Sequence, residues 1–206
     1  MIDDLKKPQL RAIQYFYTDG SFEFGFGLLC LILSVYFYIE TRVQGWLFVL
    51  VDFSLVLVMA GGAWLINRLI KQLKEHITWP RTGYIAYARQ KGARRGWSLV
   101  LGMGIGGLAA AMAVVLVERI AVMPVLAGFL FAFVLLIIGW RARLPRFHLL
   151  AGLSAVAGMI INYSGLENFV ALAVYYLVFG LVLFATGTCV LRTYLRQSPA
   201  TEEEQP

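Results

Sequence analysis

Residues 123–140 read MPVLAGFLFAFVLLIIGW, a stretch without one charged side chain. An α-helix rises about 1.5 Å per residue, so a run of about 20 apolar residues matches the roughly 30 Å hydrocarbon core of a bilayer. Strands of a membrane barrel would instead alternate apolar and polar residues over about ten positions, and this stretch does not alternate. It therefore predicts a membrane-spanning helix.

The rest of the chain has the same character. Its 206 residues are 60% hydrophobic and only 15% charged, which lies outside the usual range of soluble domains. Six apolar runs account for the excess, of which the fifth is the shortest: 22–39, 46–70, 98–117, 123–140, 149–163 and 168–194. The first run follows a charged lead and precedes no small-x-small cleavage pattern, so we interpret it as a span and not as a signal peptide. We expect an all-α membrane protein, a bundle of six transmembrane helices.

The basic residues alternate with these runs. They gather before the first run, from the end of the second run to the start of the third, between the fourth and fifth, and from the end of the sixth onward, and only Arg42 and Arg119 of the 18 lie elsewhere. Lysine and arginine concentrate on cytoplasmic loops, so both termini are predicted to be cytoplasmic (N-in/C-in). The predicted parts are a cytoplasmic segment 1–21, a transmembrane domain 22–194 with a cytoplasmic loop 71–97, and a cytoplasmic tail 195–206.

The net charge of +6 has two readings. Basic residues beside membrane spans contact anionic lipid headgroups, each worth about 1 kcal/mol near the surface. Nucleic-acid binding is the other reading, but no nucleic-acid fold signature accompanies these residues. We therefore expect the lipid bilayer as partner, with anionic headgroups at the cytoplasmic loops, and no nucleic acid.

Two stretches, 15–23 (YFYTDGSFE, with Gly27 after it) and 78–84 (TWPRTGY), carry a family resemblance. Together they resemble a group of uncharacterised bacterial six-span membrane proteins, best over residues 1–90. The resemblance implies six spans and a bacterial inner (cell) membrane, and it implies no activity. Within the loop, residues 82–89 alternate aromatic and small side chains and residues 90–92 indicate a turn, which is consistent with a short strand or hairpin on the membrane face.

The third run contains GMGIGG at residues 102–107, a literal match to the dinucleotide fingerprint G-x-G-x-x-G. That mechanism needs a preceding strand and backbone amides that no helix uses, and neither fits an apolar span. Small residues at four-residue spacing instead let helices approach closely. We expect this span to be central in the bundle or to form a dimer face.

Asp52 is the strongest candidate for a binding residue. It follows Trp46 by six positions, hence lies roughly 9 Å inside the outer boundary. An acid at that depth costs on the order of 2–3 kcal/mol unless it faces protein, water or a partner. In one interpretation, Asp52 lies in a polar pocket open to the outside and binds a cation or carries a proton. In the other, Asp52 is protonated or hydrogen-bonded to one tyrosine hydroxyl and only stabilises packing. Other polar residues of the outer third complete the predicted set: Ser34, Asn162, Tyr175 and Tyr176.

A second candidate lies at the inner boundary. Glu23 begins the first run, and we expect it to pair with Arg81 of the cytoplasmic loop, unless it is merely solvated at the interface. Cys30 and Cys189 lie inside apolar runs, and the two histidines, His76 and His148, lie in loops without other donors at metal-ligand spacing. The sequence therefore predicts neither a metal site nor a cofactor.

Three functional hypotheses follow. The first is a non-enzymatic membrane component, an accessory or sensor-type subunit that acts through a membrane-protein partner or as a homodimer. The second is a small transporter or channel for a cation or a proton-coupled solute, with its site around Asp52. The third is a lipid-modifying enzyme that uses the loop around Arg81 and Tyr84, and it lacks a recognisable nucleophile, metal set or phosphate-binding loop.

Overall fold

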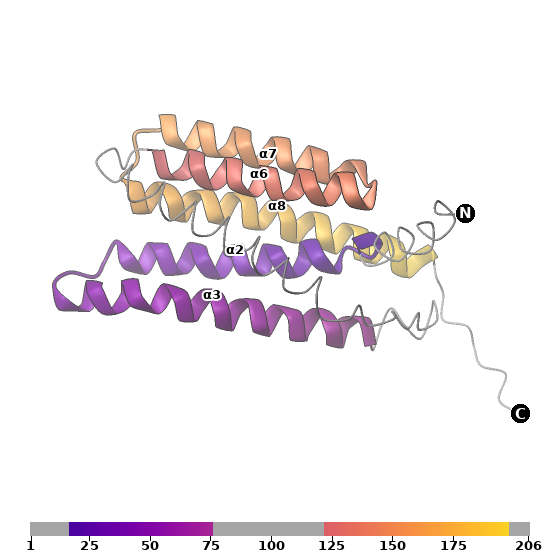
Figure 1. Cartoon of the computed structure of the whole chain (residues 1–206), viewed down its shortest axis with the longest axis horizontal. Coiled ribbons are helices and arrows are strands. Elements are labelled where there is room, and N and C mark those ends of the chain that lie inside the picture. Colours follow the sequence, from indigo (N-terminus) through magenta and orange to yellow (C-terminus); the bar gives the residue numbers. More distant parts are fainter. Residues whose placement is uncertain (1–16, 76–121, 198–206) are drawn as a thin grey trace, which may run out of the picture.

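The computed structural model describes residues 17–75 and 122–197, and every element in these ranges is helical. The helices run side by side along one axis, with their connections at the two ends (Figure 1). Their bounds are α2 Ser21–Glu40, α3 Trp46–Leu73, α6 Met123–Ala142, α7 Pro145–Tyr163 and α8 Asn168–Gln197. The predicted third span, the fingerprint-like glycine motif and nearly all of the cytoplasmic loop lie outside the described residues.

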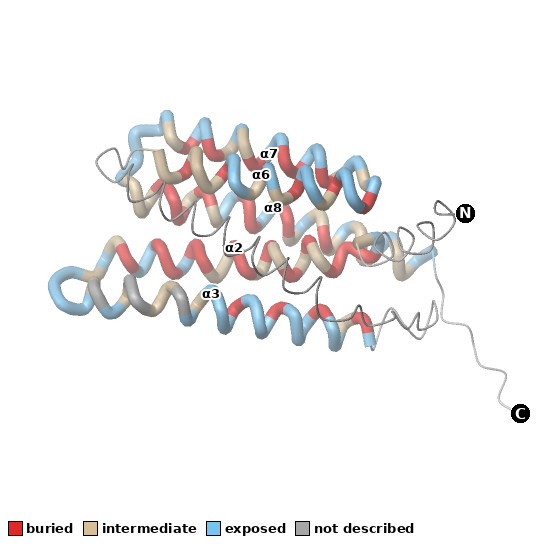
Figure 2. Tube along the Cα trace, viewed as in Figure 1, coloured by how far each residue is buried: buried red, intermediate tan, exposed pale blue. Residues whose placement is uncertain are grey.

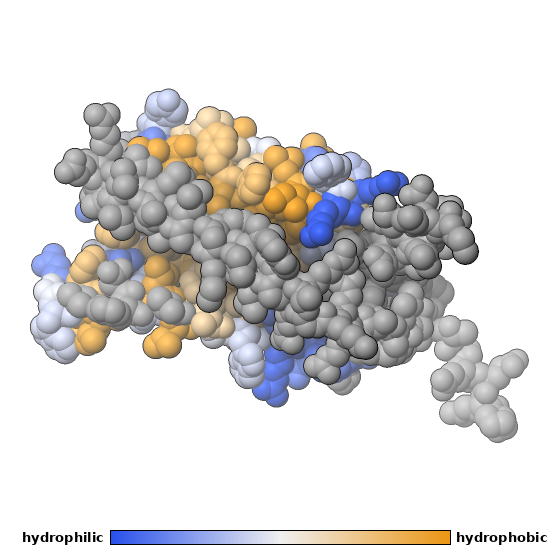
Figure 3. Space-filling model, viewed as in Figure 1, coloured by the Kyte–Doolittle hydropathy of each residue, from blue (hydrophilic) through white to orange (hydrophobic). Residues whose placement is uncertain are grey.

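Three helices, α2, α6 and α8, are long and apolar enough to cross a membrane. The 20 residues of α2 and of α6 span about 30 Å, the thickness of a hydrocarbon core. They also expose large apolar side chains that water would disfavour, such as Phe129, Phe133 and Leu181, each more than half exposed. On the face drawn in Figure 3, apolar surface covers the middle of the helices and hydrophilic residues lie toward the ends. The all-helical class is confirmed for the described residues, three of whose helices could cross a membrane, while six spans and the N-in/C-in orientation remain predictions.

Helix α2 packs most extensively on α8, although the two are far apart in the sequence. The contact is close because glycines face the opposite backbone. A Cβ added to Gly27 would lie 2.6 Å from the Phe184 amide nitrogen, and one added to Gly187 would lie 2.8 Å from Phe24 Cα. Small residues of this kind permit tight helix packing in a bilayer, where dispersion contacts replace the hydrophobic effect between helices.

Helices α6 and α7 form a second close pair of the same kind. Gly128 and Gly158 face each other, and a Cβ on Gly158 would lie 2.6 Å from the Pro124 carbonyl oxygen. The Ser154 hydroxyl donates to the Gly128 carbonyl oxygen at 2.9 Å across this contact. The two pairs then meet through α8, whose Tyr175 and other buried residues form the core with α6 and α7. Figure 2 colours the buried positions along these helices red.

Helix α3 is attached to the bundle by one narrow stripe. The stripe consists of buried residues at every fourth position: Gly62, Ile66, Ile70 and Lys74. Most of the other residues in the second half of α3 are exposed. This stripe faces α2, where an added Cβ on Gly25 would meet Ile66 and Ile70 at 2.8 Å. The stripe ends at Lys74 and so brings this charged residue to the beginning of α2.

Helix α7 begins at Pro145, four residues before the apolar run that predicted it. Proline is favoured at a first helical position because its fixed φ suits the helix and its missing N–H has no partner there. The extension matters because it places Arg146 on the first turn of α7 and not in a loop.

Candidate functional site

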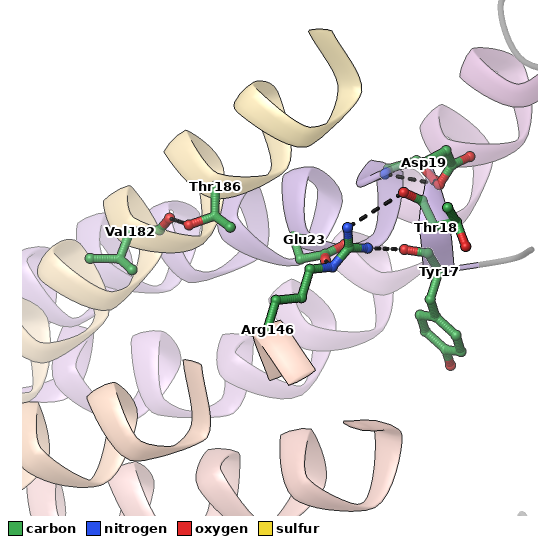
Figure 4. Close-up of polar contacts among 8 residues, drawn as sticks. Tyr17, Thr18, Asp19, Glu23, Arg146, Val182 and Thr186 are labelled. Atoms are coloured by element: carbon green, nitrogen blue, oxygen red, sulfur yellow. Dashed lines mark hydrogen bonds and ion pairs between the residues drawn. The ribbon is translucent and has the colours of Figure 1, made fainter. Parts of the chain in front are cut away.

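Four charged side chains from separate parts of the chain meet at one end of the bundle, the end at which α2 and α7 begin and α3 ends (Figures 1 and 4). We call Asp19, Glu23, Lys74 and Arg146 the charge cluster. The exposed fraction is 1% for Asp19, 0% for Glu23 and 6% for Lys74. Charged residues are rarely buried unless they are paired, so the cluster is the most distinctive polar feature of the described residues.

Arg146 connects the first turn of α7 to the beginning of α2. Its Nε lies 2.8 Å from Glu23 Oε1 in an ion pair that lacks hydrogen-bond alignment. Nη1 donates to the Thr18 carbonyl oxygen at 3.4 Å and Nη2 donates to the Tyr17 carbonyl oxygen (Figure 4). One guanidinium group thus neutralises a buried carboxylate and also fixes the backbone that leads into α2.

Asp19 and Lys74 form the second pair, with 3.3 Å between Asp19 Oδ2 and Lys74 Nζ. The other carboxylate oxygen, Oδ1, accepts from the Ser21 amide at 3.1 Å and from the Ser21 hydroxyl at 2.7 Å, which stabilises the turn into α2. Burial lowers the pKa of the Lys74 ammonium, and the Asp19 carboxylate partly offsets this effect. The Asp19 carboxylate thus favours the charged form of Lys74 against the effect of burial.

Gly20 makes this turn geometrically feasible. Its φ is +76°, in the left-handed region that favours glycine, and an added Cβ would lie 2.8 Å from the Gly187 carbonyl oxygen. The glycine therefore serves both the turn that presents Asp19 and the close approach of α2 to α8.

A groove of about 340 Å³ lies beside Arg146. It separates the segment before α2 and the first turn of α7 from the final turns of α8. We call it the Arg146 groove. Its described lining residues are Thr18, Arg146, Cys189, Val190, Thr193, Tyr194 and Gln197. The groove therefore adjoins the charge cluster through the one guanidinium that belongs to both.

The two tyrosines predicted for an outer site lie within the bundle. Tyr175 is fully buried, and its hydroxyl lies 2.8 Å from the Ser154 hydroxyl of α7. Tyr176 stacks on Phe37 with ring centroids 5.3 Å apart, and the rings of the two tyrosines are 5.4 Å apart. The contacts with Ser154 and Phe37 join α8 to other helices, and a shared pocket around the two tyrosines remains a prediction.

The other predicted residues are placed separately or lie outside the described part. Asn162 is half-buried near the end of α7, and its Oδ1 has no hydrogen-bond partner among the described residues. Asp52 lies on α3, but its side chain is outside the described part, as are Arg81 and Tyr84. The partner of Glu23 that the structure shows is Arg146, and an additional contact with Arg81 stays untested.

Sequence reasoning missed Asp19, Lys74 and Arg146 as site residues. Asp19 stands in the stretch that carries the family resemblance, and Pro145 indicates the helix start that presents Arg146. Lys74 gave no such signal, because a lysine beside a predicted span is already explained by the positive-inside rule.

No protein-family model, curated protein or solved structure matches this chain. Its function therefore has to be inferred from the chemistry of the described helices. Within that part, the four charges neutralise one another in pairs, and their chemistry is that of fixing helix ends together.

Proposed function

We propose that this chain is a multi-pass protein of a bacterial inner membrane, with six spans and both termini in the cytoplasm. We further propose that it catalyses no reaction itself and acts through a partner membrane protein or a second copy of itself. The charge cluster is the observation that carries this proposal. Its carboxylates are held by bases from other helices, so these charges are used to fix the bundle and not to present a reactive group.

The positions of the described basic residues support the orientation. Apart from Arg42, they lie on the part of α3 after Trp64, at the α6–α7 connection, or on the last turns of α8. These segments are at the same end of the bundle as the charge cluster (Figure 1). Such an end is the one that the positive-inside rule assigns to the cytoplasm.

Single cysteines test this topology. In a variant with Cys30 and Cys189 replaced by serine, Gln44→Cys and Glu167→Cys report one end, and Arg141→Cys and Gln197→Cys report the other. All four positions are exposed. In intact spheroplasts, a membrane-impermeant maleimide should label the cysteines at positions 44 and 167 alone. The cysteines at positions 141 and 197 should be labelled only after the membrane has been permeabilised. Labelling of position 141 or 197 in intact spheroplasts would refute the proposed orientation.

Photo-crosslinking tests the need for a partner. Leu57 of α3 is 73% exposed and Leu153 of α7 is 52% exposed, so a photoreactive residue at either position samples the surroundings of the bundle. In native membranes, at least one of the two should give a protein adduct of discrete mass, equal to a second copy or to one other protein. Adducts with lipid alone at both positions would count against action through a partner.

The polar contacts beside Asp52 favour a second candidate, a small transporter or channel. The Val51 carbonyl oxygen accepts from the Tyr36 hydroxyl of α2 at 2.6 Å and from the Ser54 hydroxyl at 2.7 Å. One helix turn thus gathers polar groups at the predicted depth of the aspartate, where lipid would disfavour them.

Replacing Asp52 tests the transporter directly. If the site carries a cation or proton, Asp52→Asn should abolish a pH- or cation-driven flux in vesicles reconstituted with the full chain, because the amide keeps the shape and removes the charge. Ser54→Ala is the matched control, since it removes a neighbouring hydroxyl and leaves the acid. Equal flux through the wild type and Asp52→Asn would eliminate this candidate.

A further inference from the structure

We propose that the Arg146 groove binds the phosphate group of an anionic phospholipid headgroup. The inference requires that the helices lie in a membrane, and it requires neither the partner nor the absence of catalysis proposed above. A lipid site of this kind would act as a structural or regulatory ligand at the end of the bundle that holds the charge cluster.

The lining of the groove suits an anion. Among its seven described residues the one charged side chain is Arg146, and Thr18, Tyr194 and Gln197 add hydroxyl and amide groups. The Thr193 hydroxyl donates to the Cys189 carbonyl oxygen at 2.9 Å within α8. None of these seven described lining residues is acidic. Its volume of about 340 Å³ lies at the lower end of small-ligand sites, which fits a headgroup and excludes a folded protein.

Arg146 retains the means to hold a phosphate. A guanidinium has five N–H donors in a fixed fork. The described contacts use Nε toward Glu23 and one donor on each terminal nitrogen toward the Thr18 and Tyr17 carbonyl oxygens. Among the described residues, one N–H on each terminal nitrogen has no partner, while the ion pair and the two backbone hydrogen bonds hold the fork in position before a ligand arrives. Such pre-orientation lowers the entropic cost of binding.

The charge around the groove also favours an anion. Glu23 neutralises Arg146 from the buried side. Arg192 and Arg196 are exposed on the same turns of α8 as Thr193 and Gln197, although they do not line the groove. Each basic residue close to an anionic membrane surface contributes about 1 kcal/mol to binding. The end of α8 that carries the groove is thus basic.

The depth of the groove indicates a lipid and not a soluble anion. The 30 residues of α8 extend over about 45 Å, which exceeds a 30 Å core by about ten residues. Its final turns therefore reach the headgroup layer, and these turns supply most of the lining. Phosphate groups are abundant at that depth as part of the bilayer itself.

Cys189 offers a direct assay because it lines the groove and is exposed, whereas Cys30 is fully buried. We would measure the rate at which an uncharged maleimide labels Cys189 of the full chain in nanodiscs. The rate should be several-fold lower in phosphatidylglycerol than in phosphatidylcholine. Arg146→Gln should weaken this protection about fivefold, the factor that corresponds to one basic residue at an anionic surface.

An anionic surface also lowers the local pH and slows every nearby thiol, so a control thiol is needed. Cys189→Ser combined with Arg192→Cys places the thiol on the same stretch of α8 but outside the groove lining. The thiol at position 189 is measured for this comparison in Arg192→Ser, so that both chains lack the same positive charge. Because Arg146 also belongs to the charge cluster, Gln197→Ala serves as a second groove variant that leaves the ion pairs intact. It should reduce the protection in the same direction.

Inorganic phosphate added to the detergent-purified protein distinguishes the two sources of the anion. Protection by phosphatidylglycerol alone supports the lipid site. Protection by inorganic phosphate at least as strong as that by the lipid would overturn the lipid assignment. The proposed site would be overturned if phosphatidylglycerol slowed maleimide labelling equally at positions 189 and 192. It would also be overturned if the protection of Cys189 were unchanged in both Arg146→Gln and Gln197→Ala.

Discussion

Gly187→Leu is expected to destabilise the bundle more than any other single substitution considered for this chain. Any side chain at this position would displace α2, because an added Cβ would lie 2.8 Å from Phe24 Cα and 3.0 Å from the Glu23 carbonyl carbon. These are backbone atoms that cannot rotate away. Inserted volume in a well-packed core costs about 1–3 kcal/mol where side chains can adjust, so we expect at least about 3 kcal/mol here.

The loss is measured as a lower midpoint of thermal unfolding and as aggregation in size-exclusion chromatography of the detergent-purified protein. Gly61→Leu is the matched control. It adds the same atoms to another helix, where nothing lies within 4 Å of the new Cβ. Its unfolding midpoint should stay close to that of the wild type. If both variants lost the same stability, the close approach of α2 and α8 would not be the reason.

Arg146→Met is expected to have the second largest effect, because it leaves the fully buried Glu23 carboxylate without the guanidinium that neutralises it. Breaking a buried ion pair from one side typically costs about 3–5 kcal/mol. The same substitution also removes the donors to the Tyr17 and Thr18 carbonyl oxygens and so loosens the start of α2. The free energy of unfolding in a denaturing detergent titration is the relevant measurement.

The double variant Glu23→Gln with Arg146→Met separates the ion pair from the backbone contacts. Removing the carboxylate charge as well should restore a large part of the lost stability, since no buried charge then remains unpaired. Arg192→Met is the control for a general loss of positive charge, because Arg192 is exposed on α8 and surface substitutions usually change stability by about 0.5 kcal/mol or less. A double variant less stable than Arg146→Met alone would contradict an ion pair at this position.

Most of the described helices could be predicted from hydropathy alone. The run at 123–140 became α6, Met123–Ala142, and the run at 46–70 became α3, Trp46–Leu73. Length and apolar character decide such helices, because a bilayer requires that all backbone groups be hydrogen-bonded within the segment. The ends were less predictable. At α7, residues 145–148 include an arginine and a histidine, and hydropathy assigns polar residues to loops even when a proline indicates the start of a helix.

The candidate site was predictable only in part. The position of Glu23 at the inner boundary indicated a residue that needs a partner, and the choice of Arg81 followed from its presence in the second resembling stretch. The observed partner, Arg146, is brought to Glu23 by helix pairing, which depends on contacts among α2, α7 and α8. Single-sequence patterns record which faces are apolar but not which helices meet. For the same reason, the hydrogen-bond partner of Tyr175 could not be predicted, because Ser154 lies on another helix, α7.

The pairing of α2 with α8 has a consequence for the order of biosynthesis. Ribosomes release α2 well before α8, so the first of these helices enters the membrane while its main packing partner has not yet been made. Until α8 arrives, Gly27 and the α2 backbone around it face lipid or the insertion machinery. Glu23 likewise lacks Arg146 until α7 has been synthesised. The described helices therefore cannot be packed one by one in chain order, and a nascent chain arrested after α6 would hold Glu23 without Arg146.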